Sequence, residues 1–371
     1  MDSIDAFLNR LPVRLRSMHG YVPGLQKNDT EIIKLNSNEN PYPPSDAVLK
    51  ALGSLASGAM PLQKYPPPRS SGLRSALESR YSLPPGSVLC GNGSDEVLAL
   101  LFRSLMDPGD SFVMPDPTYS LYPILADAVG VQSIAVPVDE ALHIRFDALL
   151  TEANARGSKM IIMAMPNAPT GLYESTEQIE TLIRSFAGWV VLDEAYAPFA
   201  ENSFMHRAGT DFPNLICIST FSKAWSLAGM RIGWMAAHPE LVQQIDKLRD
   251  SYNLSRAAQM AAEAAIADIA WQEENARRIK ESREWLQKEL SRLGFECLQS
   301  SANFVFARVP SGDPNQARSI FEFLEEKKIL IRYFSAPRTA PYLRISIGTP
   351  DQMAAVVRGI DEFLKAAKSR L

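Results

Sequence analysis

STFSKAWSLAGMRIGW occupies residues 219–234 and sets one lysine and one arginine among hydroxyl and apolar side chains. A lysine that forms a Schiff base must be held where its amine can lose a proton. Lys223 is the candidate for that role, and Ser222 and Arg231 are candidates for gripping a phosphate on the same aldehyde compound. A Ser-Lys pair alone is weak evidence, because most lysines lie exposed at the protein surface.

A strand-like run that ends on an acid strengthens this interpretation. Residues 189–193 are apolar up to Asp193, and Tyr196 follows three positions later. Open α/β sheets place their ligands at the carboxyl ends of the strands. Asp193 is therefore a candidate to hold a proton on the pyridine nitrogen of pyridoxal phosphate, and Tyr196 could donate to the phenolic oxygen of that ring. Taken alone, Asp193 could also be an ordinary helix-start residue.

Seven short motifs follow one another along the chain. They are NSNENPYPP at 36–44, GNGSDE at 91–96, PDPTY at 115–119, PNAPTG at 166–171, DEAY at 193–196, the 222–234 run, and YLRISIGT at 342–349. Together they resemble the fold-type I pyridoxal-phosphate aminotransferases, and within that family they are most similar to the histidinol-phosphate aminotransferases. The resemblance implies pyridoxal 5'-phosphate as cofactor. It also implies an α/β fold, in which a large domain with a mostly parallel seven-stranded sheet covered by helices is joined by a smaller α+β domain.

The composition is that of an ordinary globular protein. The chain has 371 residues, 46% of them hydrophobic and 22% charged, and a net charge of −4, with no long basic run. This disfavours a general affinity for nucleic acid or anionic membranes. The three cysteines and four histidines are widely separated, so neither a metal site nor a disulfide framework is expected. Because the first five residues are acidic and no window is apolar enough to span a bilayer, we expect a soluble cytoplasmic protein.

Strand-like and helix-like runs alternate from residue 88 to residue 186. This order predicts a largely parallel sheet covered by helices. We expect a large cofactor-binding domain at 45–270 and a small domain formed by 1–44 and 271–371, joined by a long helix around 256–293. In the small domain the pattern predicts strands at 304–309, 330–334 and 343–347, and helices at 314–327 and 351–368.

The resemblance assigns further residues to the cofactor. Ser94 and Asp95 lie in a glycine-rich turn before a helix, where backbone N–H groups can bind a phosphate. Without the other motifs such a turn would more often be a simple helix start. Tyr119 resembles the aromatic residue that stacks on the pyridine ring, although it could also be a core residue.

Two assignments to the cofactor depend on less regular features. Tyr65 resembles a tyrosine that reaches the cofactor phosphate of the partner subunit, which implies a homodimer. In the 166–171 motif, Ala168 stands where the family commonly has an asparagine. Asn167, one position earlier, is therefore kept as a cofactor contact, and Tyr196 is given most of the interaction with the phenolic oxygen.

The resemblance also assigns substrate-binding residues. Arg344 resembles the residue that grips the anionic group of the substrate, with Arg332 assisting, because a guanidinium binds carboxylate or phosphate in a two-pronged manner. Without the resemblance, arginines in such strands would be expected to face solvent. Glu39 and Asn40 are assigned to the mouth of the substrate site.

The implied reaction is a two-stage transamination, in which Lys223 holds the cofactor as an imine and then moves a proton from the substrate's α-carbon. The implied amino donor is histidinol phosphate and the 2-oxo acid is 2-oxoglutarate, in histidine biosynthesis. An aromatic or broad-specificity aminotransferase would share all the cofactor residues. A phosphothreonine-type decarboxylase is less favoured, as is a non-catalytic ligand-sensing protein, because residues 1–36 are too few and too little basic for a DNA-binding segment.

Overall fold

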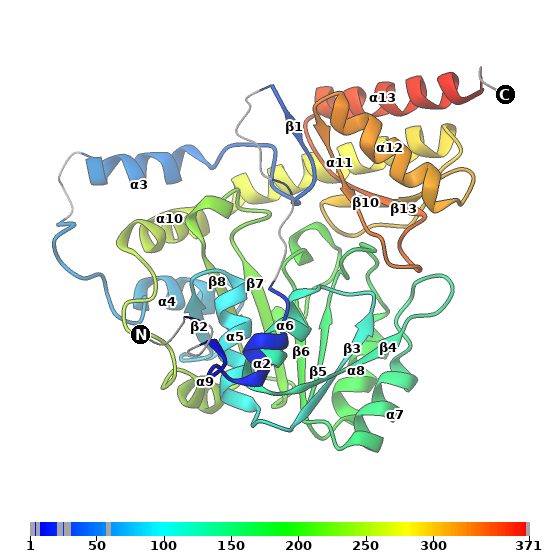
Figure 1. The fold of residues 1–371 in the computed structure, drawn as a ribbon. Coiled ribbons are helices and arrows are strands. Elements are labelled where there is room, and N and C mark those ends of the chain that lie inside the picture. Colours follow the sequence, from blue (N-terminus) through cyan, green and yellow to red (C-terminus); the bar gives the residue numbers. More distant parts are fainter. Residues whose placement is uncertain (1–3, 5–7, 21–24, 26–30, 57–60, 369–371) are drawn as a thin grey trace.

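A seven-stranded sheet forms the centre of the larger part of the molecule (Figure 1). The computed structural model describes residues 4, 8–20, 25, 31–56 and 61–368. Across the sheet the strands are β2 (Val88–Gly91), β8 (Gly233–Ala236), β7 (Leu215–Thr220), β6 (Trp189–Asp193), β5 (Met160–Ala164), β3 (Ser111–Asp116) and β4 (Gln132–Pro137). Of these strands only β8 runs in the direction opposite to the other six, which confirms the predicted mostly parallel sheet.

Helices cover both faces of this sheet. Along β5, Met160 and Ile162 join the core on one face, whereas Ile161 and Met163 join the core on the other. The first face is covered by α5 (Ser94–Leu105), α6 (Leu121–Val129) and α9 (Pro239–Ile245), and the second by α4 (Ser71–Arg80), α7 (Phe146–Arg156) and α8 (Thr176–Ser185). A parallel sheet covered in this way needs apolar residues at successive positions, which is why all of β5 is buried.

A four-stranded antiparallel sheet is formed by the C-terminal part of the chain (Figure 1). Its strands, in order, are β12 (Arg332–Tyr333), β13 (Tyr342–Ser346), β10 (Phe304–Arg308) and β9 (Glu296–Cys297). The helices α11 (Ile269–Arg292) and α12 (Pro314–Glu326) pack against this sheet, and α13 (Pro350–Lys368) packs against both helices. The observed β10, β13, α12 and α13 closely match the predicted elements.

The N-terminal segment joins this C-terminal part through one short strand pair. β1 (Ile33–Lys34) pairs in parallel with β11 (Ile329–Leu330). This pair lies within the predicted small domain of 1–44 and 271–371, and the division into domains stays a prediction. Residues 1–3, 5–7, 21–24, 26–30, 57–60 and 369–371 lie outside the described part of the chain.

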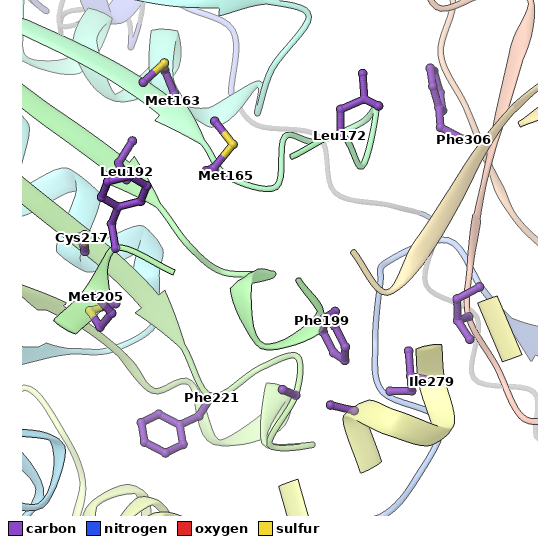
Figure 2. Close-up of a cluster of buried hydrophobic side chains, with 14 of the residues drawn as sticks. Met163, Met165, Leu172, Leu192, Phe199, Met205, Cys217, Phe221, Ile279 and Phe306 are labelled. Atoms are coloured by element: carbon purple, nitrogen blue, oxygen red, sulfur yellow. The ribbon is translucent and has the colours of Figure 1, made fainter. Parts of the chain in front are cut away.

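One hydrophobic core runs from the large sheet into the small one. Figure 2 shows part of it, with Met163, Leu192 and Cys217 on strands of the large sheet, Ile279 on α11 and Phe306 on β10. All five side chains are fully buried. Because burying a large apolar side chain stabilises a fold by about 1.5–3 kcal/mol, this shared core holds the two sheets in a defined relation.

Two observed elements correct the sequence-based expectations. The long helix predicted around 256–293 is two helices, α10 (Arg256–Ala267) and α11, because Asp268 between them has non-helical angles, φ −112° and ψ 57°. Helical composition continues across this break, so the sequence pattern did not locate it. The strand predicted at 330–334 is likewise two short strands, β11 and β12, which pair with different partners.

Candidate active site

A cavity of about 750 Å³ opens at the carboxyl ends of the parallel strands. Residues that end β3, β5, β6 and β7 form one side of its wall, and residues of β12 and β13 form another. Its wall contains the following residues that the sequence predicts as site residues: Glu39, Ser94, Asp95, Tyr119, Asp193, Tyr196, Ser222, Lys223, Arg231, Arg332 and Arg344. The fold thus brings together side chains from positions 39 to 344 in one place.

Lys223 reaches the cavity shortly after the end of β7. Its Nζ donates a hydrogen bond to the backbone oxygen of Ser37 at 3.2 Å and lies 5.8 Å from the centre of the Tyr196 ring. Burial is the main reason that the pKa of Lys223 is lowered to about 8, and the positive charge of Arg344 contributes to the same lowering. A larger fraction of the amine is therefore neutral than in an exposed lysine, and the neutral amine is the nucleophilic form.

Asp193 lies at the end of β6, where its carboxylate is buried and hydrogen bonded. Tyr122 donates to Oδ2 at 2.9 Å, and the backbone N–H of Ala195 donates to Oδ1 at 3.1 Å. Burial raises the pKa of Asp193 to about 6, while these two hydrogen bonds act in the opposite direction. A cationic ring nitrogen beside the carboxylate would favour its charged form, so the position suits a protonated pyridine.

Tyr196 follows in the same motif and places its hydroxyl in a buried polar network. Asn38 Nδ2 donates to the Tyr196 oxygen at 2.8 Å. Burial raises the pKa of Tyr196, whereas Arg344 and the bond from Asn38 lower it. The ring packs edge-on against Phe304 with centroids 5.2 Å apart. The phenol therefore remains protonated at neutral pH and retains a proton to donate.

The start of α5 and Arg231 form one end of the cavity, and both offer the N–H donors that an anion needs. Gly93 precedes the helix with φ 88°, and a Cβ there would lie 2.6 Å from Arg231 Nη2. A Cβ on Gly233 would collide with the backbone of Gly93 and Ser94. Because neither glycine has a side chain, Arg231 can lie close to the backbone N–H groups at the start of α5. Arg231 Nη2 also donates to Asp95 at 3.2 Å.

Hydroxyl side chains extend this end of the cavity. The Ser222 N–H donates to Thr220 Oγ1 at 3.1 Å, and the two hydroxyl oxygens lie 3.0 Å apart. Tyr119 donates to Asp95 Oδ1 at 3.2 Å and packs edge-on against Tyr122 at 5.5 Å. The Ser222 hydroxyl and the Tyr119 ring therefore line the cavity together with the start of α5.

Two arginines form another part of the wall. Arg332 and Arg344 are direct cross-strand partners in the β12–β13 pair. The Arg344 guanidinium lies over the rings of Phe304 and Phe334 at 5.3 and 5.4 Å, and donates to the Asn36 backbone oxygen at 3.0 Å. Like charges placed directly opposite one another are unfavourable, and an anion bound between them would relieve this repulsion.

Two asparagines predicted as contacts, Asn40 and Asn167, are not part of the cavity wall. Asn40 Nδ2 donates to the backbone oxygen of Lys223 at 2.9 Å. Asn167 is buried, and its amide bonds to the oxygen of Pro117 and the hydroxyl of Thr118, both at 3.0 Å. The structure therefore does not bring either side chain to the wall, and their roles toward substrate and cofactor stay predictions.

Tyr65 also lies outside the wall. Its side chain is 76% exposed and stacks on Tyr252 with ring centroids 4.4 Å apart. An exposed tyrosine of this kind is compatible with the predicted contact to a partner subunit, which stays a prediction.

The sequence interpretation missed three residues of the site. Thr220 lies two positions before Ser222, and its place in the hydroxyl-rich run was a sequence feature that indicated a site residue. Tyr122 lies close to Tyr119 in sequence, but its bond to Asp193 spans 71 positions. Asn38 belongs to the 36–44 motif, and no periodicity marks it as a partner of Tyr196.

The described part of the chain has neither a cluster of metal-ligating side chains nor a helix that could span a membrane. In that part of the chain, no group of three or more His, Cys, Asp or Glu side chains is arranged to hold a metal ion. None of the helices described there is both long and apolar enough to cross a membrane.

These features define a class of protein. A mostly parallel seven-stranded sheet that carries a partly buried lysine, a strand-end carboxylate and an arginine beside a helix start at one edge is the arrangement of a fold-type I enzyme. Residues 30–360 match the model of the family described as aminotransferase class I and II. The chain belongs to that family.

Individual relatives are similar over nearly the whole chain. Histidinol-phosphate aminotransferase of Citrifermentans bemidjiense is 40% identical over 350 residues, which cover 94% of this chain and 97% of the relative. Histidinol-phosphate aminotransferase 2 of Rhizobium meliloti is 40% identical over 349 residues, covering 93% and 96%. The crystal structure of histidinol-phosphate aminotransferase from Sinorhizobium meliloti in complex with pyridoxal-5'-phosphate has a TM-score of 0.89 at 26% identity, covering 98% of this chain and all of that one.

Proposed function

We propose that this protein is a pyridoxal-phosphate-dependent aminotransferase that converts histidinol phosphate and 2-oxoglutarate into imidazole-acetol phosphate and glutamate, a step of histidine biosynthesis. The observation that carries the proposal is the Lys223 amine, with a lowered pKa, in a cavity that also holds a buried carboxylate, a helix-start anion site and two arginines. Family membership supports the reaction class, and the relatives' names support the substrate.

The chemistry of the cavity wall fits the cofactor. Ser222, Arg231 and the N–H groups at the start of α5 would hold its phosphate, Asp193 its pyridine nitrogen and Tyr196 its phenolic oxygen. When bound, pyridoxal phosphate supplies an aldehyde carbon that takes up the amino group and a ring that withdraws electrons from the substrate's α-carbon.

Lys223 has two tasks in this proposal. Its neutral amine holds the aldehyde carbon until the amino donor takes its place. The freed amine then removes the proton from the substrate's α-carbon and delivers a proton to the carbon that accepts the amino group, so the same group serves first as base and then as acid. A pKa near 8 suits both steps, because a group is most effective when its pKa lies near the working pH.

The paired arginines would bind the anionic end of each substrate. Histidinol phosphate carries a phosphate, and the side chain of 2-oxoglutarate carries a carboxylate, so one pocket must accept both anions in successive half-reactions. Arg344 and Arg332 suit this task because a guanidinium pairs with either group through two hydrogen bonds.

The test is a half-reaction comparison of amino donors. Cofactor-loaded protein is mixed with histidinol phosphate, histidinol or phenylalanine, and the cofactor absorbance is followed. We expect histidinol phosphate to react with the highest specificity, and histidinol to react more slowly because it lacks the phosphate. Phenylalanine reacting faster than histidinol phosphate would replace the proposed substrate with that of an aromatic aminotransferase.

The proposal extends to assembly and location. We propose a homodimer in which Tyr65 of each subunit reaches the site of the other, supported by its 76% exposure and by the exposed Leu62 and Tyr252 near it. We also propose a cytoplasmic enzyme, as the biosynthetic role of the named relatives suggests.

A further inference from the structure

Asn38 uses each of its polar groups in a hydrogen bond to a residue distant in sequence. Its backbone N–H donates to Ser346 Oγ, and Ser346 Oγ donates to Asn38 Oδ1, both at 2.9 Å. Its backbone oxygen accepts from Asn303 Nδ2 at 3.0 Å, and its own Nδ2 donates to Tyr196 at 2.8 Å. Asn38 is only 2% exposed. Three residues therefore hold Asn38 inside the protein, and two of them, Ser346 and Tyr196, bond to its side chain.

These bonds decide which way the carboxamide faces. Ser346 Oγ accepts the Asn38 backbone N–H and donates its one hydroxyl proton to Asn38 Oδ1. With the carboxamide oxygen held at Ser346, the NH₂ group must face Tyr196. Asn38 is therefore a donor to the Tyr196 oxygen, and Tyr196 keeps its own proton for another acceptor.

The turn formed by residues 166–171 provides no side-chain amide to this part of the cavity wall. Ala168 lies in the wall and packs with Tyr196 and Phe304 as part of a small apolar cluster. The Asn167 amide is engaged by Pro117 and Thr118. Asn38, by contrast, lies in the wall beside Tyr196.

We infer that Asn38 is a positioning residue that donates to Tyr196 and so directs the Tyr196 proton toward the phenolic oxygen of the bound cofactor. This inference rests on the proposed function, because it concerns an oxygen of pyridoxal phosphate. Ser346 lies two residues after Arg344 on β13, so the same hydrogen bonds tie Tyr196 to the strand that carries the substrate arginine.

Asn38→Gly is the most selective test variant. Asn38 has φ 54°, a left-handed conformation that glycine adopts without strain, so this change keeps the backbone and its two hydrogen bonds and deletes the amide. Lys328→Gly is the matched control, because Lys328 is an exposed residue with a similar φ of 60°. Thermal unfolding of each variant checks that the fold is kept.

The readout is the absorbance of the cofactor bonded to Lys223, titrated with pH. A hydrogen-bond donor to the ring oxygen stabilises the negative charge on that oxygen. The charge then attracts the proton on the Lys223 nitrogen less strongly. Loss of that donor should therefore raise the titration midpoint. We expect a rise of about 0.5–1 pH unit in Asn38→Gly, an equal or larger rise in Tyr196→Phe, and no change in Lys328→Gly.

The double variant Asn38→Gly/Tyr196→Phe shows whether Asn38 affects the titration through Tyr196 or independently of it. Its midpoint should equal that of Tyr196→Phe, because Asn38 acts through the phenol. An unchanged midpoint in Asn38→Gly, or a full additional rise in the double variant, would overturn the inference. If Asn38→Gly does not fold, Ser346→Ala removes the group that orients the amide. It should raise the midpoint by a smaller amount, and no rise would again refute the inference.

The same titration distinguishes this inference from the proposed function. A wild-type protein that forms no pH-dependent cofactor absorbance would contradict both. A wild-type protein that titrates normally while Asn38→Gly keeps its midpoint would contradict only the role of Asn38.

Discussion

Lys223 donates a hydrogen bond from its side-chain nitrogen to the backbone oxygen of Ser37, 3.2 Å away and 186 positions earlier in the chain. From the same loop, Asn40 donates to the backbone oxygen of Lys223 at 2.9 Å. One loop thus contacts the lysine at both its side chain and its backbone. Because Asn38 in this loop is bonded to Ser346 of β13, the surroundings of the lysine depend on the packing of the small sheet as well as the large one.

Lys223→Ala should bind pyridoxal phosphate noncovalently and lose transamination, because the amine that holds the aldehyde and moves the proton is gone. Borohydride reduction followed by peptide mapping should label Lys223 in the wild type and no lysine in the variant. Lys159→Ala, which removes a lysine paired with Asp110 at the surface, is the control and should keep the label. Labelling of a different lysine in the wild type would refute the assignment.

Covalent uptake of the cofactor should speed up as the pH rises through about 8. The pKa of Lys223 is lowered from 10.5 to about 8, and the neutral amine, which reacts with the aldehyde, predominates above the pKa. The measurement is the rate of absorbance change on mixing cofactor-free protein with pyridoxal phosphate at a series of pH values. In Arg344→Ala the midpoint should move upward, because one lowering influence is removed while burial remains. A midpoint near 10.5 in the wild type would contradict the prediction.

Asp193→Asn should bind the cofactor but slow proton abstraction strongly. The amide cannot stabilise a protonated pyridine nitrogen, and in a buried site the loss can reach about 3–4 kcal/mol, or roughly a hundred- to a thousand-fold in rate. Single-turnover kinetics with histidinol phosphate would measure it. Glu194→Gln is the matched control: Glu194 is equally buried but accepts from Ser203 and the Phe204 N–H, so its loss should lower stability more than rate. Wild-type turnover in Asp193→Asn would exclude the assigned role.

Tyr65 is expected to act in the partner's site. Neither Lys223→Ala nor Tyr65→Phe homodimers should be fully active, but a mixed dimer has one site with both changes and one with neither. Mixing the two proteins should therefore restore activity in a fraction of the dimers. The measurement is activity after subunit exchange, with exchange verified by mass spectrometry. Confirmed exchange without any gain over the parent proteins would show that Tyr65 acts within its own subunit or not at all.

Arg344→Ala should weaken both half-reactions. A hydrogen bond to a charged group contributes about 1.5–3 kcal/mol, so kcat/KM should fall roughly ten- to a hundred-fold for histidinol phosphate and for 2-oxoglutarate. Arg332→Ala should reduce the reaction of the phosphate substrate more than that of the dicarboxylate. Arg308→Ala on the adjacent strand β10, which removes a partly exposed arginine paired with Glu296, is the control. Equal effects of all three substitutions would argue against a specific anion pocket.

Much of the fold was predictable from local patterns. The alternation of apolar runs indicated the parallel sheet, since burial on both faces demands apolar residues along each strand. The break at Asp268 and the division of 330–334 between two sheets were not predictable, because each depends on which neighbour the segment meets and not on its own composition.

The sequence by itself determined the residue types of the site: a lysine after hydroxyl residues, an acid and a tyrosine at a strand end, and glycines before a helix. Only the tertiary structure decided that Asn38 donates to Tyr196, that Tyr122 donates to Asp193, and that Asn167 is not part of the cavity wall. The physical reason is that hydrogen bonds act over about 3 Å with strict angular requirements. Residues 158 positions apart, such as Asn38 and Tyr196, meet those requirements only after both sheets have packed around one core.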